Sequence, residues 1–154
     1  MTIAAVGSRA PDFSTRNQHG EEIRLSQYAG HPVVLVFYPY AFSGVCTSEL
    51  TALRDRPELL ASAQFLAISC DPLFTLRAYA DHQELGFSLL TDFWPHGAIA
   101  SSYGVFDAER GCARRGTFVI DAAGVIRWSV LNAMPEARNP DDYAEALSAL
   151  TRRK

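Results

Sequence analysis

Residues 33–46 read VVLVFYPYAFSGVC, and this stretch decides the fold. Its first six residues are aliphatic or aromatic without a break, which is the pattern of a strand buried on both faces of a sheet. Pro39 ends that strand, because proline has no N–H to donate to a neighbouring strand. A helix is expected to begin directly after Ser43, a residue type that favours the N-cap position.

Similar patterns place the other elements around this strand. A second buried strand is predicted at 65–69, and the NQHG turn at 17–20 predicts a hairpin near the N-terminus. The dipeptide Asp71-Pro72 predicts the N-cap and first residue of a helix that Gly86 ends. Further along the chain, we expect a second hairpin, with strands at 117–120 and 125–128, and a last helix that Asn139-Pro140 begins and the basic residues 152–154 end.

The order of these elements predicts an α/β fold. A parallel β-α-β unit followed by an antiparallel hairpin gives a mixed central sheet flanked by helices on both faces, with an N-terminal β-hairpin. This is the thioredoxin-like plan. The chain has 154 residues, which we interpret as one domain spanning 1–154. Functional groups of such sheets lie beyond the carboxyl ends of the parallel strands, where residues 39–46 are expected.

Composition excludes several classes of protein. The net charge of −3 predicts no binding to nucleic acid or to an anionic membrane. The longest apolar run, 33–38, is too short to cross a bilayer, and the first seven residues lack the pattern of a secretory signal. An odd count of three cysteines then favours a reducing compartment, the cytoplasm. The four histidines have no metal-ligand spacing, so neither a metal nor another cofactor is expected.

Cys46 is the candidate nucleophile. If Ser43 is the N-cap, Cys46 occupies the third helical position, where unpaired backbone N–H groups stabilise a negative sulfur. For a thiol whose pKa falls by about 2.5 units, the thiolate fraction at pH 7 rises roughly 30-fold, but intrinsic nucleophilicity falls about 13-fold. Ionisation alone therefore gains about twofold, and a fast reaction needs donors that stabilise its transition state. Ser43 offers a hydroxyl, and Arg114 or Arg115, at the start of a predicted strand, offers a cation.

Together these residues resemble the peroxiredoxin family. The spacing Pro39-x-x-x-Ser43-x-x-Cys46 is similar to the family's active-site motif, in which threonine is commoner than serine, and Arg115-Gly-Thr-Phe-Val-Ile-Asp resembles its second arginine segment. The likeness spans nearly the whole chain. The DFWPHGA stretch at 92–98 and the compact C-terminus most resemble the one-cysteine, alkyl hydroperoxide reductase E type.

The resemblance implies a thiol-dependent peroxidase with a role in antioxidant defence. Cys46 would reduce hydrogen peroxide, alkyl hydroperoxides or peroxynitrite and become sulfenic acid. Arg115 and Ser43 would bind the peroxide, Pro39 would shield the sulfur, and Glu49 would orient an arginine. The implied partners are a hydroperoxide, an external reducing thiol or a thioredoxin- or glutaredoxin-like protein, and a second copy of the chain in a homodimer. Tyr40 and Phe42 are candidates for that contact or for ordinary core.

Two alternatives stay open. Cys70, at the carboxyl end of the second predicted strand, is a candidate to resolve oxidised Cys46 through a disulfide, or else a small core residue. Cys112 is a weaker candidate for the same role, and the default is a one-cysteine cycle. A thioredoxin-fold redox sensor, in which Cys46 oxidises once and relays a signal, is the alternative to an enzyme. Repeated peroxide consumption with an added thiol separates the two.

Overall fold

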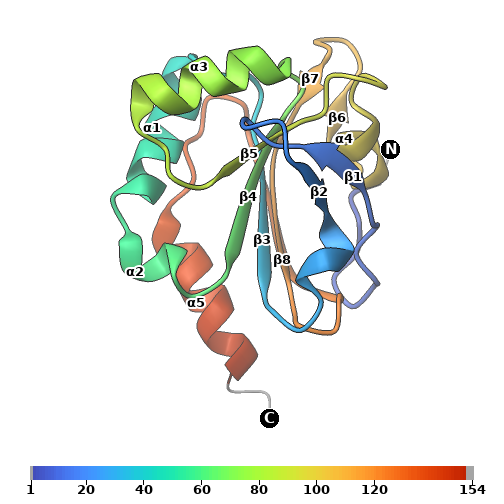
Figure 1. Cartoon of the computed structure of the whole chain (residues 1–154). Coiled ribbons are helices and arrows are strands. Elements are labelled where there is room, and N and C mark those ends of the chain that lie inside the picture. The colour runs from blue at the N-terminus through green and yellow to red at the C-terminus, as the bar shows by residue number, and fades with distance from the viewer. Residues whose placement is uncertain (1, 152–154) are drawn as a thin grey trace.

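A five-stranded mixed sheet lies at the centre of the molecule (Figure 1). A computed structural model of the chain describes residues 2–151. Strands β3 (Val33–Phe37), β4 (Gln64–Ser69) and β5 (Ser88–Thr91) run parallel, while β8 (Arg115–Ile120) and β9 (Ile126–Asn132) continue the sheet in antiparallel pairing. The strand order is β5-β4-β3-β8-β9, so the predicted buried strand is the middle one and is covered on both faces.

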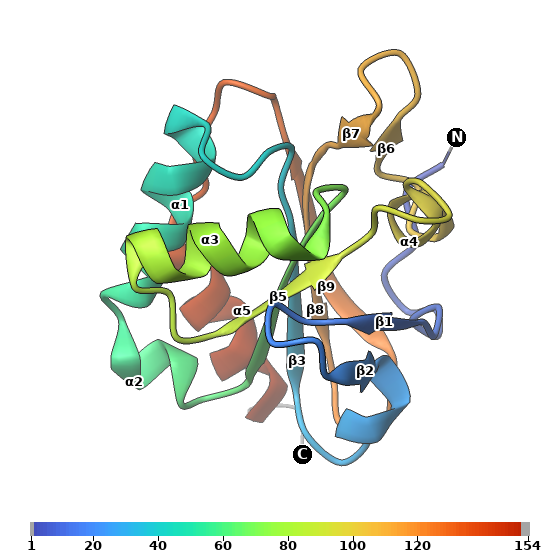
Figure 2. The same ribbon diagram turned by 45° about the horizontal axis from the view of Figure 1, so that its top comes forward.

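Four helices cover one face of the sheet (Figure 2). They are α1 (Gly44–Arg54), α2 (Pro57–Leu60), α3 (Leu73–Gln83) and α5 (Pro140–Thr151). Each contributes apolar side chains to a core that also contains the Val34 and Val36 side chains of β3. The alternation of a strand sends the neighbouring side chains, Leu35 and Phe37, to the opposite face.

Shorter elements cover that opposite face. They are the hairpin β1 (Ser14–Arg16) and β2 (Glu22–Arg24), the 3-10 turn η1 (Leu25–Tyr28), α4 (Ala98–Ser102) and the pair β6 (Phe106–Asp107) and β7 (Cys112–Ala113). A second apolar core joins them to the sheet, with Tyr103 and Phe118 fully buried in it. The predicted thioredoxin-like architecture, with its N-terminal hairpin, is therefore confirmed. The order of elements predicted from the sequence did not include β5, α2, α4 or the β6–β7 pair.

Two predicted helix boundaries were wrong. The N-cap of α3 is Pro72 and not Asp71, because the Asp71 carboxylate instead accepts hydrogen bonds from the Ala41 N–H at 2.8 Å and the Ser69 hydroxyl at 2.7 Å. The same helix ends before Gly86. Glu84 takes the left-handed conformation, with φ of 54°, and its N–H bonds back to the last turn.

The last helix begins as predicted. The Asn139 side chain accepts a hydrogen bond from the Asp141 N–H at 3.0 Å, and both Asp141 and Asp142 lie in the first turn of α5. The basic residues 152–154, predicted to end this helix, lie outside the described residues. Between residues 2 and 151, no helix is both long and apolar enough to cross a membrane.

Candidate active site

Cys46 lies in the first turn of α1, at the carboxyl end of β3. Ser43 is the N-cap of this helix in extended conformation, and Thr47 donates its N–H to the Ser43 carbonyl at 2.9 Å. Cys46 is therefore the third residue of the helix, as the sequence predicted. Its side chain is fully buried and packs in the core that includes Val36, Tyr38 and Leu50.

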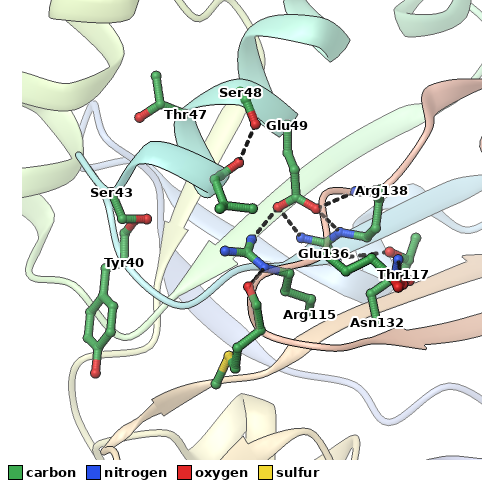
Figure 3. A network of polar contacts seen from close by, with 12 residues as sticks. Tyr40, Ser43, Thr47, Ser48, Glu49, Arg115, Thr117, Asn132, Glu136 and Arg138 are labelled. Carbon is green, nitrogen blue, oxygen red and sulfur yellow. Dashed lines mark hydrogen bonds and ion pairs between the residues drawn. The ribbon is translucent and has the colours of Figure 1, made fainter.

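One turn further along α1, Glu49 holds two buried arginines (Figure 3). The Arg115 side chain donates to Glu49 Oε1, and its Nε donates to the Met134 carbonyl. Arg138 donates from Nε to Glu49 Oε2 at 2.7 Å and from Nη2 to Oε1 at 3.0 Å. All three side chains are at most 5% exposed, so water screens these charges little.

This ion group carries more positive than negative charge. Two guanidinium groups share one carboxylate, which leaves about one buried positive charge uncompensated beside the start of α1. Among the described residues, Arg115 Nη2 has no hydrogen-bond partner. Figure 3 shows the Arg115 guanidinium between Glu49 and the beginning of the helix that carries Ser43. A negative sulfur or a polarised oxygen placed there would gain both charge and a free donor.

Arg138 is a site residue that the sequence analysis missed. It lies just before α5, 89 positions after Glu49, and it also donates to the Gly116 carbonyl and the Thr117 hydroxyl at 3.0 Å each. Burial lowers the pKa of Arg138, but the hydrogen bond and the charge of Glu49 outweigh burial, so this pKa is raised. Arg138 therefore stays charged. Its only sequence signal is its place beside the predicted N-cap Asn139.

A cavity of about 230 Å³ opens beside this group. Its lining includes Pro39, Ser43, Val45, Arg115, Cys112 and Met134. Three predicted site residues, Pro39, Ser43 and Arg115, thus meet at one cavity, although Arg115 is far from the others in sequence. Cys46 follows the lining residue Val45 and is itself sealed from solvent.

The structure also gives the positions and contacts of the other predicted residues. Arg114 is exposed, whereas Arg115 is 3% exposed, so the strand presents Arg115 to the interior as expected from alternation. Ser43 uses its hydroxyl proton in a 3.1 Å bond to the Tyr40 carbonyl, which leaves the oxygen's lone pairs free to accept. Cys70 is buried at the end of β4 and, like the other two cysteines, has a free thiol.

No group of three or more metal-ligating side chains is present in the part of the chain that the structure describes. A larger cavity, of about 480 Å³, lies at the opposite edge of the sheet, where Val33 begins β3. It is lined by Arg9, Asp12 and His31, which are all exposed, and it contains no cysteine. The chemistry available to a buried thiol is therefore concentrated at the smaller cavity.

The profile of the AhpC/TSA family matches residues 6–129, which is most of the chain. The chain belongs to this peroxiredoxin family and is a thiol-dependent peroxidase with an antioxidant role. This finding confirms the resemblance on which the sequence analysis relied.

Individual relatives support the same family assignment. Alkyl hydroperoxide reductase E of Mycobacterium tuberculosis is 44% identical over 149 residues, which cover 95% of this chain and 97% of the relative. Mouse peroxiredoxin-2 is 35% identical over 158 residues, covering 95% of this chain and 79% of the relative. The solved structure of peroxidoxin BcpB from M. tuberculosis superposes with a TM-score of 0.81 at 29% identity, covering 97% of both chains. That of a reduced Plasmodium vivax 2-Cys peroxiredoxin gives 0.87 at 25% identity, covering 96% of this chain and 82% of the other.

Proposed function

We propose that Cys46 is the residue that reduces the peroxide. Its thiolate attacks one oxygen of a hydroperoxide, an S–O bond forms as the O–O bond breaks, and the leaving oxygen departs with a proton as water or an alcohol. Cys46 is oxidised by two electrons to sulfenic acid. The observation that carries this proposal is the buried ion group of Glu49, Arg115 and Arg138, whose surplus positive charge lies beside the first turn of α1.

Arg115 and Ser43 are proposed to bind the peroxide in the cavity. The unpaired Nη2 of Arg115 stabilises the charge that develops on the leaving oxygen. The Ser43 oxygen accepts the hydrogen of the peroxide, because its own proton is directed to the Tyr40 carbonyl. Glu49 acts through the arginines as a positioning residue.

Pro39 is proposed to keep water from the oxidised sulfur. Its ring is buried at the cavity wall, two residues beyond the end of β3, and it has no N–H that would need a partner. Because Cys46 is also fully buried, the first turn of α1 must shift for peroxide to reach the sulfur or for a reductant to reach the sulfenic acid. The structure allows this shift, because the Ser43 side chain makes no capping hydrogen bond to the helix.

The size and lining of the cavity support small hydroperoxides as substrates. A volume of about 230 Å³ admits hydrogen peroxide, a short alkyl hydroperoxide or peroxynitrite. Val45 and Met134 give the cavity wall apolar side chains. These favour the alkyl group of an organic hydroperoxide over water. We propose that an external thiol, or a thioredoxin- or glutaredoxin-like protein, completes the cycle.

The test is peroxide consumption with excess dithiothreitol. An enzyme consumes many equivalents of hydrogen peroxide per Cys46, measured as peroxide remaining over time. Consumption that stops after one equivalent would contradict an enzymatic cycle and favour the redox-sensor alternative, in which Cys46 is oxidised only once.

We further propose a cytoplasmic homodimer of this one domain. Exposed aromatic side chains follow the carboxyl ends of three parallel strands: Phe42 after β3, Phe74 after β4 and Trp94 after β5. Apolar rings gathered at one edge are typical of a contact between copies. Light scattering of the protein and its Trp94→Glu variant tests this, with a dimeric mass expected for the first and a monomeric mass for the second.

The three free thiols support the proposed cytoplasmic location, because the cytoplasm is a reducing compartment.

A further inference from the structure

The larger cavity, of about 480 Å³, has no part in the proposed reaction with peroxide. It lies where β3 begins, at the edge of the sheet opposite to Cys46, and no cysteine lines it. Its volume falls within the range of about 300–1,000 Å³ that is typical of sites for small organic molecules. The construction of its walls and the state of its polar groups indicate which kind of molecule fits it.

Three segments that are far apart in the sequence form the walls of this cavity: residues 9–12, 25–31 and 120–124. In Figure 1, η1 and the turn between β8 and β9, which belong to the last two segments, lie side by side at the lower end of the sheet. The buried part of the lining is apolar and includes the side chains of Leu25 and Val33. Such a lining favours a ligand with a hydrocarbon body.

Backbone hydrogen bonds hold these walls together. The first segment is joined to the third by the Ala10 N–H, which donates to the Gly124 carbonyl at 2.9 Å. The second segment is joined to the third by the Gly30 N–H, which donates to the Ala122 carbonyl at 2.9 Å. The cavity is therefore pre-formed, and a ligand would lose little affinity to the ordering of its backbone.

The two carboxylates in the lining already receive hydrogen bonds from the protein. Asp12 Oδ1 accepts from the N–H groups of Phe13 at 2.9 Å and Ser26 at 3.0 Å, and the second of these bonds joins the first wall segment to the second. Asp121 Oδ2 accepts from Arg127 Nε at 2.7 Å, and its Oδ1 accepts from two N–H groups of the turn. Donors of the protein thus stabilise both negative charges.

The donor side chains in the lining are not used in this way. Within the described part of the chain, the side chains of Arg9 and His31 and the hydroxyl of Tyr28 make no hydrogen bond or ion pair. A Cβ placed on Gly124 would lie 3.2 Å from Arg9 Nη1, so the guanidinium packs against the turn in the third segment. Even a neutral imidazole carries one N–H donor. Burial raises the pKa of Tyr28, so its hydroxyl keeps its proton.

We propose that this cavity binds a small organic carboxylate with an apolar body, such as an aryl carboxylate. The carboxylate group faces Arg9 and His31, and the hydrocarbon body covers Leu25 and Val33. The inference does not depend on the proposed peroxidase function, because none of the residues assigned to that function lines this cavity.

The expected affinity is modest, because Arg9 and His31 are exposed. An exposed ion pair changes a dissociation constant by at most about fivefold, and burial of the apolar body supplies most of the remaining affinity. We therefore expect a dissociation constant on the order of 1 mM for a simple aryl carboxylate.

The experiment titrates phenylpropanoate into the fully reduced wild type and follows the backbone signals by two-dimensional proton–nitrogen NMR. Saturable shifts are expected at residues 29–31 and 121–124, which belong to two of the walls. Two further probes have the same phenylpropyl body: phenylpropanamide is neutral and phenylpropylamine is a cation. The amide should bind at least about threefold more weakly than the carboxylate, and the amine more weakly than the amide.

The Arg9→Gln variant tests the role of the cation. Glutamine keeps a long polar side chain but carries no charge, so phenylpropanoate should bind at least about threefold more weakly, while phenylpropanamide should change by less than about twofold. The matched control is Arg24→Gln. Arg24 is also exposed, but it pairs with Glu22 at 2.8 Å and does not line the cavity. This change lowers the net charge equally and should leave both dissociation constants unaltered. Circular dichroism checks that both variants are folded.

Four results would overturn the proposal. The first is a lack of saturable shifts at the cavity up to about 10 mM phenylpropanoate. The second is an amide or amine that binds as tightly as the carboxylate, since the cavity would then not select an anion. The third is equal weakening in Arg9→Gln and Arg24→Gln, which would assign the preference to the net charge of the protein. The fourth is a set of shifts confined to residues 43–47 and 115, which would place the probe at the smaller cavity.

Discussion

Two cavities lie at opposite edges of the central sheet. They differ in whether the polar and charged side chains beside them are exposed or buried. The cavity at the start of β3 has about 480 Å³, and its Arg9, Asp12 and His31 are all exposed. The one at the carboxyl edge has only about 230 Å³, but it borders Arg115, which is 3% exposed and bound to buried Glu49. Water weakens the interactions of an exposed charge several-fold more than it weakens those of a buried charge. We therefore expect reactivity to follow the buried charges and not the volume of the cavity.

The largest effect is expected at Cys46. Cys46→Ser replaces the nucleophilic sulfur by a hydroxyl that does not ionise near neutral pH, so peroxide consumption with dithiothreitol should fall to the background rate. Consumption above background in the folded variant would show that another thiol reacts with peroxide. Circular dichroism provides the control for folding.

Glu49→Gln should cause the next largest effect. Both arginines lose the carboxylate that they share, which leaves two buried positive charges uncompensated. Breaking a buried ion pair in this way costs about 3–5 kcal/mol of unfolding free energy. Urea denaturation measures the loss.

The matched control is Glu58→Gln on α2. Glu58 pairs with Arg56 at 2.5 Å, but its side chain is 66% exposed. The change should alter the unfolding free energy by less than about 1 kcal/mol. Equal losses in the two variants would contradict the distinction between buried and exposed charge.

A smaller effect is expected at Ser43. Ser43→Ala removes one hydrogen-bond acceptor from the cavity and should slow the oxidation of Cys46 by hydrogen peroxide about tenfold. Ser43→Thr keeps the hydroxyl and should retain the rate, as measured by stopped-flow tryptophan fluorescence. If the threonine variant were as slow as the alanine variant, the hydroxyl would not be the group that matters.

The smallest effect is expected at the larger cavity. Arg9→Ala and His31→Ala remove exposed side chains at the edge opposite to Cys46, so each should change the peroxide rate by less than about twofold. The same stopped-flow measurement applies. A large loss of rate in either variant would mean that the two edges are linked, which the comparison of buried and exposed charges does not predict.

The sequence predicted the local geometry around Cys46 well. Pro39, Ser43 and Cys46 lie within eight consecutive residues, so the end of one strand and the beginning of one helix fix their relation. Arg115 was predicted because it begins a strand that was itself recognisable. The resemblance to the peroxiredoxin family, and not the strand pattern alone, favoured it over Arg114, which lies just before β8 and is exposed.

The parts that escaped prediction depend on contacts between distant segments. Arg138 follows no periodic pattern, and only the folded chain brings it to Glu49, 89 positions earlier. Asp71 has the residue type and the place of a helix N-cap, but the Ala41 N–H and the Ser69 hydroxyl occupy its carboxylate. Local preference was overruled there by a partner that the local sequence does not contain.

The most direct test of the central claim compares two reactions of Cys46 in the wild type and in Arg115→Ala. If buried positive charge and a free donor act on the peroxide transition state, the rate constant with hydrogen peroxide should fall by about 10²–10³-fold. The rate constant with iodoacetamide, which presents no oxygen pair to the arginine, should fall by less than about tenfold. An equal fall in both rate constants would contradict the account, because Arg115 would then act only on the sulfur.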